Sequence, residues 1–270
     1  MSELVQLSIH DGVATVTFNN PPRGYMNAPQ VDAANVIVDT LEALDDVRAV
    51  IFTGGVPGVF IRHYDVGELV AISKQLRGGH VDDRALAEQA RSGNAVSALF
   101  DKVAALPMPT IAAIDGFAQG GGFEFALCCD FRIAARGDYR IGLPETNIGI
   151  FPGAGGIERL SQLIGQARAT EMVLRGRTAT PEEAAVIGMV NWLADGSALQ
   201  AATELARELA AKSPRALADA KALLRGAQTM SLADGMAETR ARFLLLLKHD
   251  DTALAAMQAF LATGEDINRR

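Results

Sequence analysis

Two glutamates in the middle of the chain are the residues best suited to proton chemistry. Glu124 follows the glycines 120–122, and Glu145 follows a Leu-Pro pair. Two facing carboxylates can orient one water and move two protons, because one accepts a proton from the water while the other donates one to a substrate. A Pro-Glu pair is also common at helix starts, where the carboxylate complements the helix dipole, so a purely structural interpretation of Glu145 stays open.

The glycine run could supply a site for negative charge beside Glu124. It lies between an apolar strand and a short helix expected within 120–130. Successive glycines let a ligand approach closely, and N–H groups at a helix N-terminus stabilise developing negative charge. This pattern favours an oxyanion hole. The alternative is that the glycines only permit a tight turn; a dinucleotide-binding loop is disfavoured, since no third glycine follows at its spacing.

An alternation of strands and helices surrounds these residues. Residues 4–9 and 13–18 predict a hairpin around Asp11-Gly12, and 29–46 has the apolar spacing of a helix. Further strands are expected at 47–53, 110–115 and 131–135. The pattern predicts an α/β fold wound as a βαβ-like spiral.

The last third of the chain reads as helical. Thr180, Pro181 and Glu183 form a helix start, with threonine as N-cap, proline at the first position and glutamate closing a capping box. From residue 197 onward the sequence predicts helices with breaks near 213–214, 226 and 249–250. We therefore expect a core carrying the active site over 1–196 and a C-terminal helical oligomerisation region over 197–270.

Composition narrows the class of protein. The chain has 270 residues, 49% of them hydrophobic, and a net charge of −7, which argues against nucleic-acid binding. No apolar run approaches the ~20 residues of a bilayer span, and the start lacks a basic segment followed by an apolar one, so a cytoplasmic location is expected. Adjacent Cys128 and Cys129 predict reduced, buried thiols. The four histidines are scattered without ligand spacing, so no metal is expected.

The sequence resembles the enoyl-CoA hydratase/isomerase (crotonase) family over nearly its whole length. The resemblance rests on MPTIAAIDGFAQGGGFEFALCCDFRIA, LPETNIGIFPGAGGIERL, EMVLRGRTATPEEAAVIGMV and the helical tail. It implies a crotonase-like spiral of β-β-α units with a C-terminal helical region, assembled as a homotrimer or a dimer of trimers. It further implies an acyl-CoA thioester substrate, with CoA as part of that substrate and no separate cofactor, and a place in fatty acid metabolism.

The resemblance also assigns roles by position. The N–H groups of Tyr64 and Gly121 would form the oxyanion hole, and Gly153 would help to hold a water. Glu124 and Glu145 match the paired glutamates of the hydratases. The implied reaction is hydration of a 2-enoyl-CoA to a 3-hydroxyacyl-CoA.

The loop before the glycine run departs from the family pattern. Where family members carry small residues, this chain has Arg62, His63 and Tyr64 ahead of the matching Asp65. The implied contacts to CoA come from Arg23, Arg62 and Asp65. His63 is either a third acid/base group for an altered reaction or a surface and packing residue.

Other functions remain open at this point. The same oxyanion hole could serve double-bond isomerisation, a lyase reaction, decarboxylation or thioester hydrolysis. A non-catalytic CoA-binding or RNA-binding paralogue is a further alternative. The acidic net charge argues against RNA, and retention of both Glu124 and Glu145 argues against lost catalysis.

Overall fold

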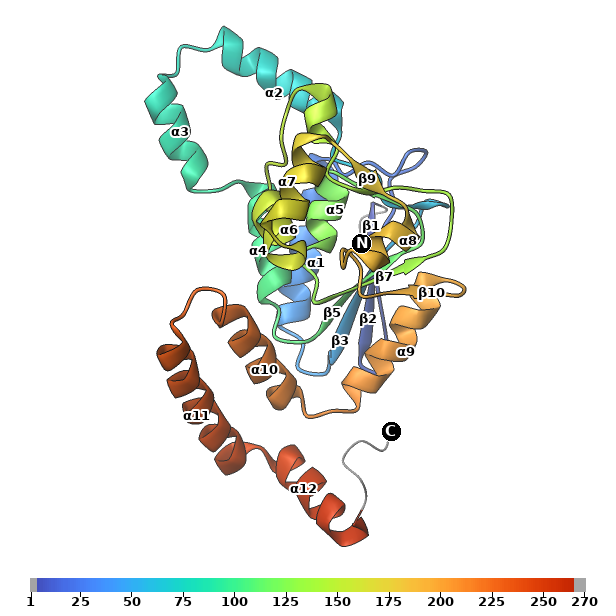
Figure 1. The fold of residues 1–270 in the computed structure, drawn as a ribbon, viewed down its shortest axis with the longest axis vertical. Helices are drawn as coiled ribbons and strands as arrows, with labels where there is room; N and C mark the ends of the chain where they lie inside the picture. The colour runs from blue at the N-terminus through green and yellow to red at the C-terminus, as the bar shows by residue number, and fades with distance from the viewer. Residues whose placement is uncertain (1–3, 265–270) are drawn as a thin grey trace.

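Two β-sheets form the centre of the protein. The computed structural model describes residues 4–264 (Figure 1). The larger sheet has the strand order β1-β2-β3-β5-β7-β10, with β1 antiparallel to β2 and the other neighbours parallel. Its strands are β1 (Val5–His10), β2 (Val13–Phe18), β3 (Ala49–Gly54), β5 (Thr110–Ile114), β7 (Phe131–Ala135) and β10 (Trp192–Ala194). The smaller sheet, in the order in which its strands pair, is β4 (Val59–Ile61), β6 (Phe117–Gln119), β8 (Ile141–Gly142) and β9 (Thr178–Ala179).

The chain winds between the two sheets as a spiral. Each of β3, β5 and β7 in the large sheet is followed directly by a strand of the small sheet, namely β4, β6 and β8. Helices then return the chain to the large sheet. The predicted α/β spiral of β-β-α units is confirmed, and the predicted hairpin pairs His10 with Val13 across its turn.

The helices fall into a packed set and a projecting set. The packed set consists of α1 (Ala28–Glu42), α4 (Ala95–Ala105), α5 (Gly121–Ala126), α6 (Gly156–Ile164), α7 (Gln166–Leu174), α8 (Pro181–Val186) and α9 (Ala198–Ala210). The projecting set consists of α2 (Val66–Gly78), α3 (Asp83–Arg91), α10 (Pro214–Gly226), α11 (Leu232–His249) and α12 (Asp251–Thr263). Figure 1 shows α2 and α3 standing out from one side of the body and α10–α12 forming an arm on another.

Local capping explains where these helices begin and end. Thr180 caps α8 and Glu183 completes the capping box, as the sequence predicts. The helix predicted over 29–46 instead ends at Glu42. The N–H groups of Ala43 and Leu44 bond to carbonyls three residues back, at 3.2 and 3.3 Å, and this tighter last turn ends the helix before β3.

Both faces of the large sheet are covered at its centre, which explains why the central strands β3 and β5 are largely apolar and buried. On β3, Val50 and Phe52 face the main core, whereas Ala49 and Ile51 face α9. Helix α9 presents alanines at 198, 202 and 206, whose small side chains allow close approach to the sheet. The helix directly after residue 196 therefore packs against the sheet, and helices α10–α12, which have no buried residues, project beyond it.

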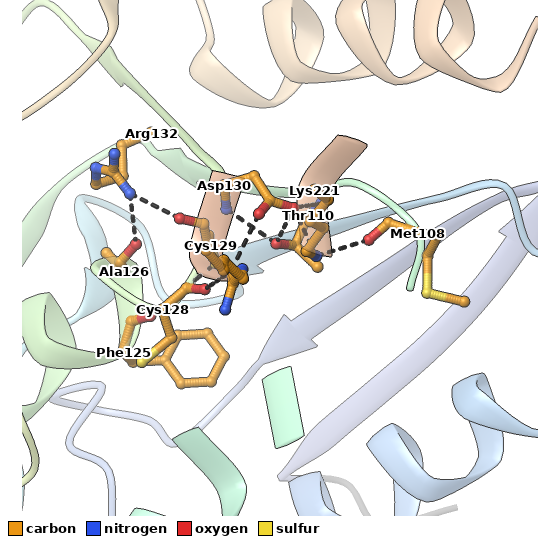
Figure 2. Close-up of polar contacts among 10 residues, drawn as sticks. Met108, Thr110, Phe125, Ala126, Cys128, Cys129, Asp130, Arg132 and Lys221 are labelled. Atoms are coloured by element: carbon orange, nitrogen blue, oxygen red, sulfur yellow. Dashed lines mark hydrogen bonds and ion pairs between the residues drawn. The ribbon is translucent and has the colours of Figure 1, made fainter. Parts of the chain in front are cut away.

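The carboxylate of Asp130 attaches α10 to the body. It accepts hydrogen bonds from the backbone N–H and the hydroxyl of Thr110, at 2.8 and 2.9 Å (Figure 2). It also pairs with Nζ of Lys221 at 2.7 Å and with Arg225 at 3.1 Å, both from α10. Lys221 donates in addition to the Met108 carbonyl. One partly buried carboxylate therefore joins the starts of β5 and β7 to the first helix of the arm.

Replacing Lys221 by methionine tests this attachment. The substitution keeps the length of the side chain but removes a cation from a mostly buried carboxylate, so we expect the free energy of unfolding to fall by about 3 kcal/mol in urea titrations. Lys102→Met is the matched control, because Lys102 and Asp39 form an exposed pair worth at most about 1 kcal/mol. Equal losses in the two variants would contradict the attachment.

Candidate active site

One cavity brings together the residues that the sequence singled out for chemistry. Its volume is about 1110 Å³, and it lies between α2, α5 and the loop around 145–154. The cavity is lined by five of the predicted residues: Tyr64, Gly121, Glu124, Glu145 and Gly153.

Glycine is required at the entry to α5 for two separate reasons. Gly120 has φ 50°, which favours glycine, and a Cβ there would lie 3.2 Å from Oε1 of Glu145. A Cβ on Gly122 would overlap the Ile61 carbonyl at 1.9 Å. Tight packing therefore accounts for Gly120 and Gly122, while the N–H of Gly121 at the first helical position has no acceptor in the part of the chain that the structure describes.

A second free N–H lies beside that of Gly121. The carbonyl of His63 accepts from the Met26 N–H at 2.9 Å, and the Met26 carbonyl accepts from Asp65 at 2.7 Å. Because the two ends of a trans peptide point in opposite directions, this bridge turns the N–H of Tyr64 away from Met26. A Cβ on Gly121 would be 3.5 Å from that nitrogen. Within residues 4–264 neither N–H is bonded, so two donors stand side by side.

Glu124 is buried, and one of its two carboxylate oxygens is hydrogen-bonded to backbone. Glu124 is only 4% exposed. Its Oε1 accepts hydrogen bonds from the N–H groups of Ala154 and Gly156, at 2.8 and 2.9 Å. Burial raises its pKa, and the two hydrogen bonds oppose that rise. A Cβ on Gly156 would lie 2.7 Å from Cγ of Glu124, so only glycine fits there. Sequence reasoning did not assign these donors, although the glycine-rich run 153–156 was a signal for them.

The other end of α5 is fixed by Arg132 of β7. This residue is 5% exposed, and its NH1 group donates to the carbonyls of Ala126 and Cys129, at 3.3 and 2.8 Å (Figure 2). A cation is favourable at a helix C-terminus. The neighbouring Cys128 and Cys129 are free and buried, as predicted, and burial raises the pKa of the Cys128 thiol to about 12.

Glu145 has the opposite environment. It begins the 3₁₀ turn η1 (Glu145–Ile148). Both carboxyl oxygens are buried and lack a hydrogen-bond partner among the described residues. Burial raises the pKa of Glu145 to about 7, its own backbone N–H opposes the rise, and the charge of Glu124 adds to it. The cavity therefore holds one carboxyl group that is bonded to backbone and another whose oxygens have no hydrogen bond to another described residue.

The three side chains predicted to contact CoA are engaged elsewhere in the protein. The guanidinium of Arg62 lies over the Phe117 ring at 4.5 Å, and its Nε donates to the Arg23 carbonyl. Arg23 is exposed and contacts Tyr25, and Asp65 caps α2 by accepting from the N–H of Gly67. None of the three lines the cavity. Their contact with CoA stays a prediction.

The bulky residues before the glycine run form a small polar network at the cavity wall. The His63 ring stacks on Tyr25 with centroids 4.4 Å apart, and its Nδ1 lies 2.7 Å from the Tyr64 carbonyl. That nitrogen must carry the proton, since a carbonyl only accepts. The Tyr64 hydroxyl donates to Glu68 at 2.7 Å, and Glu68 accepts from the N–H of Ala28. No sequence pattern predicted this link to α1.

A family model described as enoyl-CoA hydratase/isomerase matches residues 8–266. The chain belongs to this family. It is 32% identical over 259 residues to a protein of Bacillus subtilis named "Probable enoyl-CoA hydratase", covering 95% of each chain. A crystal structure of an enoyl-CoA hydratase from Bacillus anthracis matches with TM-score 0.84 and 27% identity over 97% of both chains. The structure of Pseudomonas aeruginosa DspI matches with TM-score 0.85 and 31% identity over 100% of this chain and 97% of that one.

The polar groups that line the cavity include carboxyl groups and backbone N–H groups, with Glu124 and Glu145 supplying the carboxyls. Over residues 4–264 there is no cluster of three or more His, Cys, Asp or Glu that could hold a metal ion. No helix in this range is long and apolar enough to cross a membrane.

The raised pKa of Glu145 predicts a pH-dependent cost to stability. In the unfolded chain this carboxyl has its ordinary pKa, whereas in the folded protein its pKa is about 7. The folded state therefore binds more protons than the unfolded state above the ordinary pKa, and it loses stability as pH rises toward 7. We expect Glu145→Gln to gain roughly 2 kcal/mol of unfolding free energy relative to wild type between about pH 5 and pH 8. Denaturant titrations at both pH values measure this, and a difference independent of pH would contradict it.

Proposed function

We propose that this protein hydrates a 2-enoyl-CoA thioester to a 3-hydroxyacyl-CoA. The observation that carries the proposal is the contrast between two carboxyl groups of one cavity. Glu124 is held by two backbone N–H groups, whereas Glu145 is unbonded and has a pKa of about 7. Different proton occupancy in neighbouring carboxyls is what acid and base roles require.

The paired N–H groups give the thioester its place. The carbonyl oxygen of the substrate binds between the N–H groups of Tyr64 and Gly121, which have no other acceptor within the described chain. They stabilise the enolate charge that develops on that oxygen as water adds at the β-carbon. The N–H of Gly153, also at the cavity wall, helps to hold the water between the two carboxyl groups.

The proton count then assigns the roles. Ionised Glu124 accepts a proton from the water as its oxygen bonds to the β-carbon. Protonated Glu145 donates its proton to the α-carbon, which closes the enolate to the saturated thioester. The net addition is one water, and exchange of a proton from Glu124 to Glu145 restores the starting state. A pKa of about 7 lets Glu145 carry that proton near neutral pH.

Removing either carboxyl tests this assignment. Glu124→Gln and Glu145→Gln should both fold and each lose about 10²- to 10⁴-fold in kcat. The measurement is loss of the conjugated enoyl-thioester absorbance with 2-butenoyl-CoA and longer analogues. Glu204→Gln, at an exposed position of α9 outside the cavity lining, is the control and should keep full activity. Activity at the wild-type level in both test variants would refute the mechanism.

The backbone role of Tyr64 gives a separate test. Tyr64→Pro deletes the N–H and should lower kcat about 10²- to 10³-fold on every thioester, since one oxyanion donor is lost. Tyr64→Ala keeps the N–H and should retain substantial activity on some enoyl-CoA. Circular dichroism must show that both variants are folded. Equal activity of the folded proline and alanine variants would exclude the oxyanion role.

We also propose assembly as a homotrimer or dimer of trimers through the C-terminal helices. Helices α11 and α12 have no buried residues and expose large apolar side chains, among them Leu232, Phe243, Leu244 and Leu261. Apolar surface of this kind favours contact with another subunit. The cytoplasmic location and the place in fatty acid metabolism remain predictions.

A further inference from the structure

Helix α2 turns an apolar stripe toward the cavity. Val66, Leu69, Ile72 and Leu76 all line it, at spacings of three and four residues that place them on one face of the helix. No residue of α2 is buried, and Ile72 and Leu76 are each 47% exposed. The face that would normally pack on a core is therefore open to the cavity.

A second apolar wall faces into the same cavity. Ile148, Ile150 and Phe151, which directly follow Glu145 and Thr146-Asn147, line it and are 59%, 41% and 70% exposed. Val96, at the start of α4, adds a further apolar side chain. Two uncovered apolar walls in one cavity indicate an apolar occupant, because exposed patches of this kind are costly unless they bind something.

The position of the two apolar walls indicates which part of the ligand they would contact. The stripe begins two residues after Tyr64 and lies in the cavity that contains Glu124 and Glu145. It runs along α2 to Leu76, beyond which the cavity is lined by Arg77. A single ligand can therefore fill the groove and also place its reacting carbons between the two carboxyl groups.

We propose that this groove binds a medium to long, unbranched acyl chain, so that the preferred substrate is an enoyl-CoA of that class. The inference rests on the proposed function for the location of the thioester. The ten residue steps from Val66 to Leu76 rise about 15 Å, and an extended chain advances about 1.2 Å per bond. The α2 wall is thus long enough for roughly twelve bonds of the chain. A short acyl group would leave most of both walls in contact with water.

Binding of saturated acyl-CoAs tests the groove independently of catalysis, since these thioesters cannot be hydrated. In calorimetric titrations from butanoyl-CoA to dodecanoyl-CoA, affinity should rise with each methylene, by up to about four-fold at full burial. Equal affinity across the series would overturn the proposal.

Variants on two faces of α2 locate the effect. Ile72→Asp places a charge in the groove and should lower the dodecanoyl-to-butanoyl affinity ratio at least about ten-fold. Val70→Asp is the matched control, because Val70 is equally exposed at 47% but does not line the cavity, and its ratio should equal that of wild type. Equal falls in the two variants, or none in either, would exclude a groove on this face. Equal exposure and the absence of buried residues on α2 make both substitutions compatible with folding.

Turnover separates this proposal from the proposed function. With 2-enoyl-CoAs, kcat/KM should rise from four carbons to twelve, and Ile72→Asp should flatten the rise. Hydration of 2-butenoyl-CoA with a flat chain-length profile would overturn the acyl groove and leave the hydratase assignment intact. A rising affinity for saturated acyl-CoAs without hydration of any enoyl-CoA would support the groove and overturn the hydratase assignment. A second copy of the chain covering the groove would appear as affinity that depends on protein concentration, and that result too would overturn the proposal.

Discussion

The buried carboxylate of Glu124 must be hydrogen-bonded, and this requirement organises the site. A charge taken out of water is costly unless donors replace the solvent. Here the donors are the N–H groups of Ala154 and Gly156, and Gly156 is the first residue of α6. The start of α6 therefore stabilises the proposed base, while the start of α5 leaves the N–H of Gly121 unbonded at the cavity. Two helix N-termini meet at one cavity, and each supports negative charge.

The carboxyl group of Glu145 lacks hydrogen bonds of this kind, and in the proposed mechanism this contrast distinguishes the two glutamates. Burial raises the pKa of Glu145 to about 7 against the lowering effect of its own backbone N–H, and its oxygens have no hydrogen bond to another described residue. In the proposed mechanism, the different surroundings of two identical side chains thus make one the base and the other the acid.

The parts that could be predicted from the sequence are those encoded in local patterns. The capping box at Thr180, the strands within 110–115 and 131–135, and the glycine run before Glu124 each depend on residues next to one another, and the fold follows their order. The end of α1 was predicted four residues too late, because apolar spacing continues past the turn in which Ala43 and Leu44 bond three residues back.

Features set by contacts between distant segments could not be predicted. The donors to Glu124 come from about thirty residues further along the chain, and the orientation of Arg62 depends on Phe117. The apolar groove was hidden for the same reason. Residues 66–76 show helical apolar spacing, but only the fold reveals that this face meets the cavity and not the core.

The central claim is that two carboxyl groups with different proton states add water across a conjugated thioester. Reaction of 2-butenoyl-CoA in water labelled with heavy oxygen, followed by mass spectrometry, tests it most directly. The account predicts a product heavier by one labelled water, with the label at the β-carbon of the acyl group. An isomer of unchanged mass, or free CoA with the label in a released carboxylic acid, would contradict it.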